Sequence, residues 1–434
     1  MRNLILIVVF FISNFLFANT ELQKLIDNAK PGTPVALEKK TYTITFPIYL
    51  KSGIKINGNG AVLIPSKDWK KSNDKYAALL NLVNVNNVEI SNMAIDNEGY
   101  KSVQNIVYTS VLLLGANNCK IKSIFFNNSG YLPEDKILPE SPFILLIAQE
   151  KAYDFPYLTK KNSGILSSTS NNIISDCKFI NNKTKSAFAI RFITNWTDKK
   201  RVFNNLVSGN SISNCTFEGG FDYNTVEIAG GGTVGNVVFN NNFKGKSVNN
   251  IDIDKGSSNN IIKENKLLGL GLPERYINNS DVRCSPIMVH GSDSTYLAQN
   301  NQVINNTISN ISNPTKYNSR YLYSSAIGAA YVENLVIDSN VISSIYDESK
   351  YGAGITMDQY VSNVTVTNNK VLNSYWGIIY TPNGKYYKGI SISNNQIKSN
   401  AEPIMIKRRK DGNYNSSVSK GNIFDNNKST VIDK

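Results

Sequence analysis

The chain has 434 residues, of which only 18% are charged, and 46 Lys and Arg against 33 Asp and Glu give a net charge of +13. A hydrophobic content of 41% excludes a disordered chain, and four cysteines in so long a chain exclude a disulfide-dense scaffold. A single histidine argues against a zinc site built from His and Cys pairs.

The first 18 residues have the pattern of a secretory signal peptide. Arg2 precedes an apolar run over residues 4–17, and Ala18 offers a small residue for cleavage. The run is too short to span a bilayer comfortably, and no later apolar segment reaches spanning length. We therefore expect an exported chain, periplasmic or extracellular, without a stable membrane span, and a single mature domain over residues 19–434.

A short helix is expected first in the mature chain, over about residues 20–30. Residues 20–23 form a capping-box pattern, and Pro31 ends the helix. Strands are expected next at residues 41–46, 54–56 and 61–64, because these runs are β-prone and glycines separate them.

From residue 88 onwards a short unit recurs, at intervals of roughly 20–40 residues. Each unit has an alternating strand, an Asn or Ser corner and another apolar residue, as in residues 172–179, 210–217 and 260–267. Asn suits such corners because it tolerates left-handed backbone and can bond its own main chain. Strands that cannot bury their inner face alone must stack on the next unit, so the pattern predicts a parallel β-helix whose first coil is covered by the helix.

The cysteines are expected to be buried free thiols. Cys177 and Cys215 hold the same place in two similar units, and equivalent positions stack inside a solenoid. Because the chain is exported, a disulfide involving them, Cys119 or Cys284 is chemically allowed, and the sequence leaves that state open.

Residues 31–37, 41–44 and 52–60 resemble the N-terminal region of pectate-lyase-like right-handed parallel β-helix proteins. The repeats extend that resemblance over nearly the whole mature chain. It implies an all-β fold, a single-stranded right-handed parallel β-helix with an N-terminal capping helix. The superfamily includes lyases, hydrolases, epimerases, phage tailspikes and adhesins, so function has to be argued from the site.

A second strand precedes most of the Asn-rich units, and its alternation predicts two columns of outward-facing side chains. The first column holds Arg191, Glu227, Asp252 and Met288. The second column holds Ala229, Asp254, His290, Ala330, Asp358, Thr381 and Lys407. Parallel coils stack about 4.8 Å apart, so we expect Asp254 beside His290 and Glu227 beside Asp252.

These columns suggest a site. Carboxylates held so close together raise one another's pKa or bind a cation, and Ca²⁺ would suit Glu227, Asp252 and Asp254. His290 beside Asp254 has the arrangement of a general acid or base oriented by its partner. The alternative interpretation is that the columns are ordinary charged surface, solvated and without function.

Lys255 and the Ser-Ser-Asn-Asn that follows Gly256, with residues 289–291 one coil later, are locally similar to chondroitinase B and related alginate lyases. That resemblance implies that Lys255 removes the C5 proton of a uronic acid and that His290 matches the family's histidine. The family's catalytic Arg is replaced by Val289 here, and its calcium-binding Glu by Asn250. Arg191 or Arg283 could supply the missing cation.

Three functions remain open at this point. The first is a polysaccharide lyase that uses Lys255 or His290 as the base, with Asp254, Asp252 and Glu227 around it. The second is a glycoside hydrolase that uses paired carboxylates. The third is a non-catalytic glycan-binding or surface protein.

The expected partner is an acidic polysaccharide rather than a nucleic acid, because the chain is exported and basic and has no recognised nucleic-acid module. Apart from calcium no cofactor is expected, and the sequence leaves the oligomeric state open. Candidate substrate-binding residues are charged or aromatic groups of the columns and loops: Arg191, Asp358, Tyr380, Lys407, Arg408, Arg409, Arg320 and Tyr321.

Overall fold

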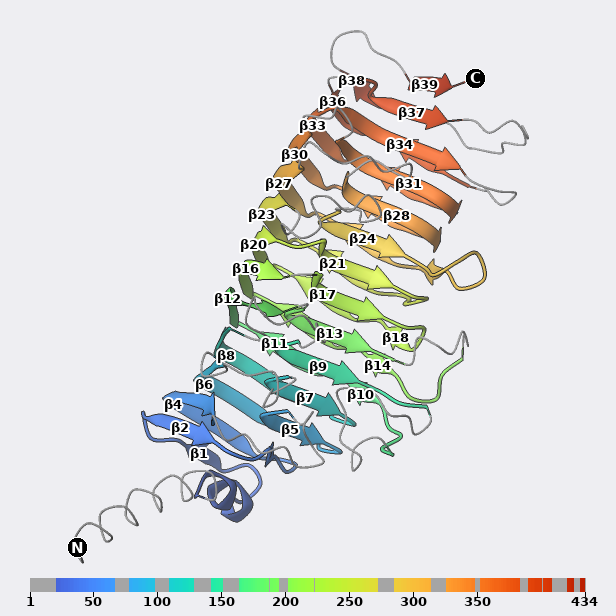
Figure 1. Ribbon diagram of the computed structural model, residues 1–434. Helices are drawn as coiled ribbons and strands as arrows, with labels where there is room; N and C mark the ends of the chain where they lie inside the picture. Colours follow the sequence, from blue (N-terminus) through green and yellow to red (C-terminus); the bar gives the residue numbers. More distant parts are fainter. Residues whose placement is uncertain are drawn as a thin grey trace, which may run out of the picture.

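The chain folds into a right-handed parallel β-helix, in which successive coils stack along one axis (Figure 1). The computed structural model describes residues 21–66, 78–97, 109–128, 142–150, 164–186, 188–194, 202–221, 223–271, 285–313, 325–347, 352–382, 389–399, 401–407, 420–424 and 430–433. The predicted signal peptide and its cleavage site lie outside these residues. In the described part of the chain, no helix is both long and apolar enough to cross a membrane.

The first coil is covered by a helix over residues 21–28, which lies at the N-terminal end of the solenoid (Figure 1). Leu22 and Ile26 on its inner side are 2% and 1% exposed and join the core. The side chain of Gln23 bonds both the main-chain N–H and the carbonyl of Tyr49, at 3.0 Å each. The capping-helix prediction is confirmed, because an open coil end needs partners for its apolar face and its strand edge.

Parallel strands form three sheets within the described residues. The largest sheet contains 22 strands, namely β1 (Pro34–Ala36), β2 (Thr41–Ile44), β4 (Lys55–Pro65), β6 (Glu89–Asp96), β8 (Lys120–Asn127), β11 (Ile173–Ser175), β12 (Lys178–Ser186), β15 (Ser211–Ser213), β16 (Thr216–Phe221), β19 (Val237–Phe239), β20 (Asn242–Lys246), β22 (Ile261–Lys263), β23 (Lys266–Gly271), β26 (Gln302–Ile304), β27 (Thr307–Asn313), β29 (Val336–Asp338), β30 (Val341–Asp347), β32 (Thr365–Thr367), β33 (Lys370–Ser374), β35 (Ser391–Ser393), β36 (Gln396–Ser399) and β38 (Ile423–Phe424). The two expected strands at 54–56 and 61–64 are one strand, β4.

A second sheet, here called the site sheet, has 14 strands within the described residues. These are β3 (Ile48–Tyr49), β5 (Leu80–Val83), β7 (Val111–Leu114), β9 (Ile144–Ile147), β13 (Ile190–Ile193), β17 (Asn224–Ala229), β21 (Asn249–Asp254), β24 (Ile287–His290), β25 (Ala298–Gln299), β28 (Ser325–Glu333), β31 (Ala353–Ser362), β34 (Trp376–Pro382), β37 (Ile404–Lys407) and β39 (Thr430–Asp433). The third sheet is small and contains β10 (Thr169–Ser170), β14 (Val207–Ser208) and β18 (Thr233–Val234).

One coil illustrates how the repeat builds the fold. The chain runs along β21 in the site sheet, turns into the short strand β22, passes an Asn corner and continues as β23. Inward side chains of successive coils stack directly, as in the run of Phe126, Phe179, Phe217 and Phe243, whose neighbouring ring centroids lie 4.8, 4.9 and 4.6 Å apart. Such stacking buries each coil's apolar face against the next coil.

Buried asparagines form two ladders along the inside of the corners. In each ladder the side-chain oxygen of one Asn accepts hydrogen bonds from the main-chain N–H and the side-chain amide of the Asn in the preceding coil, as Asn306 does from Asn265 at 3.0 Å. The longer ladder runs through Asn241, Asn265, Asn306, Asn340, Asn369, Asn395 and Asn422, and the shorter through Asn172, Asn210, Asn236, Asn260 and Asn301.

Cysteines stand at the head of both ladders. The main-chain N–H of Cys215 donates to Asn241, and that of Cys119 donates to Asn172, each at 2.9 Å. Cys119, Cys177 and Cys215 are buried free thiols, as expected, while Cys284 lies outside the described residues. The fold therefore uses Cys and Asn interchangeably at one inward position, since both are small enough to stack there.

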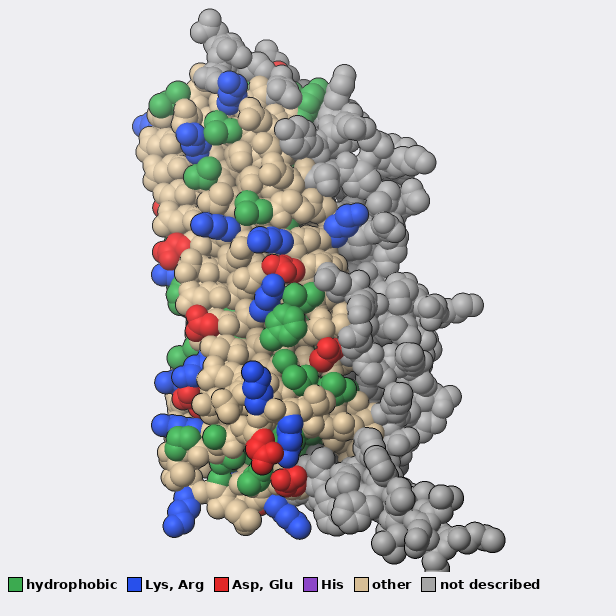
Figure 2. Space-filling model, turned by 90° about the vertical axis from the view of Figure 1, so that its left-hand side faces the viewer, with side chains coloured by type: hydrophobic (Ala, Val, Ile, Leu, Met, Phe, Trp, Pro, Cys, Tyr) green, Lys and Arg blue, Asp and Glu red, His purple; other side chains and the backbone are tan. Residues whose placement is uncertain are grey.

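The outer face of the 22-stranded sheet does not gather charge. Figure 2 shows isolated Lys, Arg, Asp and Glu side chains scattered over a mostly uncharged surface, and several described ones form local pairs, such as Lys122 with Glu89 and Lys178 with Glu218. Such exposed pairs stabilise a fold little. The lone histidine belongs to β24 of the site sheet.

Candidate functional site

The strand register confirms the first predicted column and, from Ala229 to Asp254 and from His290 to Thr381, the second. Along the first column, Arg191 pairs with Glu227, Glu227 with Asp252, and Asp252 with Met288. Along the second, Ala229 pairs with Asp254, and His290 with Ala330, which pairs in turn with Asp358 and that with Thr381. The prediction depended on alternation alone, and a slip of one residue would have reversed every side chain.

The acidic centre of these columns is buried rather than exposed, so the interpretation as ordinary solvated surface is wrong for it. Arg191, Glu227 and Asp252 are 1%, 1% and 2% exposed, and Asp254 is 6% exposed. Charges are taken out of water only where partners or a ligand compensate for the lost hydration. The arrangement of those partners divides the columns into two parts.

The first part is a closed ion pair. Nε of Arg191 bonds Oε2 of Glu227, and its guanidinium lies 4.3 Å from the ring centroid of Phe188. Asn224 adds a hydrogen-bond donor at 3.4 Å from Oε1 of Glu227. Burial raises the pKa of Glu227 to about 7, although the Arg191 guanidinium acts in the opposite direction.

This pair bears on two of the predicted roles. Arg191 was expected to bind substrate, but it is fully buried and bonded to Glu227. Glu227 was expected to be a calcium ligand and a member of the catalytic group, but its carboxylate is committed to Arg191. The sequence could not show that Glu227 bonds Arg191. The strand register places Glu227 between Arg191 and Asp252, but it does not say which of the two its carboxylate contacts.

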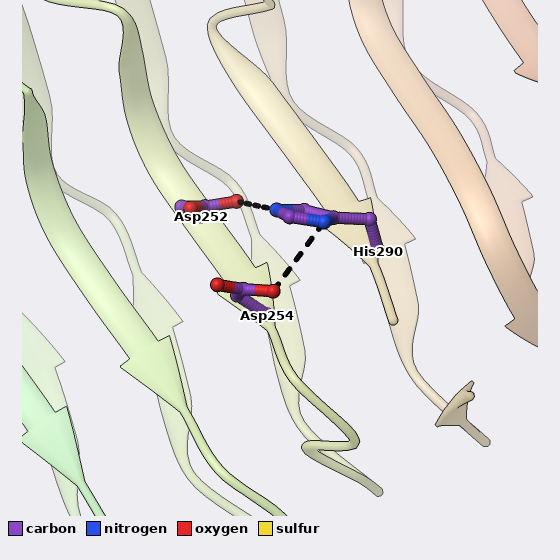
Figure 3. A group of neighbouring side chains, drawn as sticks. All are labelled: Asp252, Asp254 and His290. Atoms are coloured by element: carbon purple, nitrogen blue, oxygen red, sulfur yellow. Dashed lines mark ion pairs between the residues drawn. The ribbon is translucent and has the colours of Figure 1, made fainter. Parts of the chain in front are cut away.

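The second part is an open cluster of Asp252, Asp254 and His290 (Figure 3). Nε2 of His290 lies 3.3 Å from Oδ1 of Asp252, and Nδ1 lies 3.3 Å from Oδ1 of Asp254. Asn224 donates to the other oxygen of Asp252 at 2.7 Å. Desolvation raises the pKa of Asp254, while His290 acts to lower it. The predicted contact between Asp254 and His290 is confirmed, and the histidine also reaches Asp252.

Lys255 follows Asp254 in the chain, and its side chain folds back toward the carboxylate of Asp254. Its Nζ lies 3.5 Å from Oδ2 of Asp254, with 31% of the side chain exposed. The next residue, Gly256, has a φ of +80°, and a Cβ there would lie 2.7 Å from the ring of Tyr296. The hydroxyl of Tyr296 in turn accepts a hydrogen bond from the main-chain N–H of Gly231 at 2.7 Å. A tyrosine from the next coil therefore fixes the turn that presents Lys255.

These groups open into a pocket with a volume of about 470 Å³. Residues of five successive coils line it: Tyr223, Val248, Asn249, Asp252, Asp254, Lys255, Met288, His290, Gly291, Ser292, Ala330, Tyr331 and Gln359. Because Ala330 is small, the pocket continues beyond His290 toward Gln359. It therefore contains two carboxylates, an imidazole, an amine and two phenol rings.

Three pocket residues share an unusual backbone. Lys255, Tyr331 and Gln359 have φ values of 53°, 52° and 60°, and each directly follows a residue of the second column. Most other non-glycine residues of the protein with a positive φ are Asn, which tolerates the left-handed backbone conformation. For Lys, Tyr and Gln the conformation costs about 1–3 kcal/mol, and such strain concentrates at functional sites. Sequence analysis missed Tyr223, Tyr331 and Gln359, although the last two follow column positions and could have been found that way.

The remaining predicted site residues are not all brought together. Asp358 is 9% exposed and accepts hydrogen bonds from Gln359 N–H at 2.7 Å and Thr381 at 2.8 Å, two coils from His290. Tyr380, expected to contact substrate, is a core residue with 0% exposure, because it alternates with Thr381 and points inward. Lys407 pairs with Asp433 in the register of β37 and β39, and its side chain lies outside what the structure describes. Arg408, Arg409, Arg320, Tyr321 and Arg283 lie outside the described residues.

No family model matches the chain, and no curated protein sequence matches it. Solved structures do. An alginate lyase from Paenibacillus sp. str. FPU-7 is 17% identical with a TM-score of 0.48, over 74% of this chain and 91% of that chain. PfbA, a surface adhesin of Streptococcus pneumoniae, is 14% identical with a TM-score of 0.50, over 90% and 89%.

The tailspike of E. coli bacteriophage HK620, solved in complex with a pentasaccharide, is 13% identical with a TM-score of 0.51. That match covers 89% of this chain and 62% of the tailspike chain. At these identities the likeness shows the fold alone. It is the parallel β-helix that the repeats predict.

Proposed function

We propose that this protein cleaves an acidic polysaccharide by β-elimination in the pocket at Lys255 and His290. The observation that carries the proposal is the pocket itself, in which an amine, an imidazole and two carboxylates of adjacent coils share one open space. Buried acids in a concave site, next to a base that reaches solvent, are the arrangement expected of a catalytic centre.

The walls of the pocket favour a carbohydrate. Tyr223 and Tyr331 supply rings of the kind that stack on sugars, and Gln359 and Asn249 supply amides that can bond hydroxyl groups. The tailspike of similar fold is described in complex with a pentasaccharide, which supports the same class of ligand. An acidic glycan is favoured because the chain carries a net charge of +13.

Elimination requires a base at C5 of a uronate. In the proposed step, Lys255 in its neutral amine form takes the C5 proton, the electron pair of the C5–H bond forms the double bond between C4 and C5, and the bond from C4 to the glycosidic oxygen breaks. The departing oxygen takes a proton from solvent. The step also needs a cation at the uronate carboxylate, and the buried Arg191 cannot supply it because Glu227 engages it.

Replacing Lys255 by Ala should lower turnover by at least about 100-fold, because a positioned base contributes 10²–10⁴-fold. The measurement is the ultraviolet absorbance of the unsaturated product on a panel of uronate polymers. Lys263→Ala is the matched control, since Lys263 is also a partly exposed lysine beside an acid but belongs to β22 on the other sheet.

Each outcome of this assay is informative. Absorbance that persists in Lys255→Ala at the level of Lys263→Ala would remove Lys255 as the base. New reducing ends without absorbance would show a hydrolase that uses the paired carboxylates. Binding to an acidic glycan with neither signal would show the non-catalytic alternative.

A further inference from the structure

We infer that Asp252, Asp254 and His290 form a binding site for a divalent first-row transition metal ion of the Zn²⁺ or Mn²⁺ type. Each of the three offers one ligand atom, and these atoms lie within 4.8 Å of one another. They come from two adjacent strands, β21 and β24, and their side chains converge (Figure 3). The role we give the ion, to neutralise a substrate carboxylate, rests on the proposed function. Binding of the ion does not.

The distance between Nε2 of His290 and Oδ1 of Asp252 suits a shared ion better than a shared proton. Both ring nitrogens of His290 lie 3.3 Å from a carboxylate oxygen, longer than the 2.7–2.9 Å of a charge-assisted hydrogen bond. Two ligands bound about 2.1 Å from one ion, at angles between square and tetrahedral, lie about 3.0–3.4 Å apart. A neutral imidazole would also turn one lone pair toward a carboxylate, which an intervening cation relieves.

A second observation points to a ligand at the same place. Oδ1 of Asp252 is buried and accepts no hydrogen bond from any described group, and it faces Nε2 of His290. The other oxygen of Asp252 is held by Asn224, so the carboxylate is oriented with one oxygen left for the cluster. A buried carboxylate oxygen without a donor needs a positive partner, and beside a neutral His290 a metal ion bound to Nε2 would supply it.

The donor set selects the metal. Calcium takes six to eight oxygen ligands, but this cluster offers one nitrogen and two carboxylates, and Glu227 is held by Arg191. Imidazole with carboxylates suits Zn²⁺ or Mn²⁺, with one ring nitrogen bound and the other kept against a carboxylate that fixes the ring. The open side faces the pocket, where the ion would neutralise a uronate carboxylate in place of the missing arginine.

The metal-free full-length mature chain should be titrated with ZnCl₂, MnCl₂ and CaCl₂ by isothermal calorimetry, in the absence of glycan. We expect one site per chain for Zn²⁺ or Mn²⁺, tighter than for Ca²⁺. His290→Ala and Asp252→Asn should each weaken it by at least about 100-fold, since even indirect partners of metal ligands contribute 10–100-fold. Asp338→Asn, at an acid on β29 of the other sheet, should leave it unchanged.

Folding is checked by the circular dichroism and melting temperature of each metal-free variant, and Asp252→Asn conserves shape if His290→Ala is unstable. No stoichiometric binding, equal binding in the variants, or tighter binding of Ca²⁺ would each overturn the inference. Because no turnover is measured, metal binding by an inactive protein would refute the proposed lyase and leave the metal site standing. An active lyase that binds no metal would do the reverse.

Discussion

Replacing Glu227 by Gln should lower the free energy of unfolding by about 3–5 kcal/mol, the largest loss we expect from a single isosteric change. The substitution removes the charge of the carboxylate that bonds the Arg191 guanidinium, which is 1% exposed. The ring of Phe188, whose centroid lies 4.3 Å from the guanidinium, carries no net charge that could replace it. The measurement is the urea dependence of tryptophan fluorescence and circular dichroism at a pH well above the pKa of about 7 of Glu227, where its carboxylate is charged.

The double variant Arg191→Met/Glu227→Met is the control that isolates the charge. It removes both ions and keeps apolar volume, so it should be more stable than Glu227→Gln and close to the natural protein. If Glu227→Gln unfolded within about 1 kcal/mol of the natural protein, the pair would be behaving as a surface salt bridge, and water would have to reach it.

Replacing Asn306 by Ala should destabilise the solenoid by about 4 kcal/mol, because each orphaned buried polar group costs about 1–3 kcal/mol. The main-chain N–H and side-chain amide of Asn265 lose their common acceptor. The carbonyl of Ile262 loses a donor at 3.0 Å, and the bond to Asn340 is lost as well. Denaturant titration and hydrogen exchange of the Asn265 amide report the two consequences separately.

Asn305→Gly is the neighbouring control. Asn305 is exposed and has a φ of +55°, which Gly adopts freely, so this change removes a side chain without straining the turn. It should alter stability by no more than about 0.5 kcal/mol. Equal losses at the two positions would mean that Asn acts through the corner's backbone conformation and that the ladder contributes little.

The geometry of the site was largely predictable. Side chains alternate strictly in a strand, so the apolar positions of β21 and β24 decide which way Asp252, Asp254 and His290 point. The coil spacing then places Asp254 beside His290, as the structure has it. The same reasoning placed Thr381 outward, and it should have placed Tyr380 inward rather than among the substrate-binding residues.

The partners of each charge were not predictable. Sequence put Glu227 between Arg191 and Asp252, but only side-chain geometry shows that Glu227 bonds the arginine and that His290 bridges the two aspartates. The choice matters because it moves the expected metal site from three carboxylates to two carboxylates and an imidazole. Pocket walls that come from other coils, such as Tyr223 and Gln359, could not be assigned from a local pattern either.

The sequence by itself determined the architecture, because a β-helix is a local repeat: alternation sets the faces, Asn corners set the turns, and each coil contacts only its neighbours. Tertiary structure decided what burial does to that repeat. Burial places the corner asparagines of successive coils within hydrogen-bond distance, so that they form ladders. It also excludes water from the charged side chains of the columns, so that each buried charge needs a specific partner. Hydrogen-bond and ion-pair partners depend on ångström-scale placement across coils, and strand periodicity does not encode it.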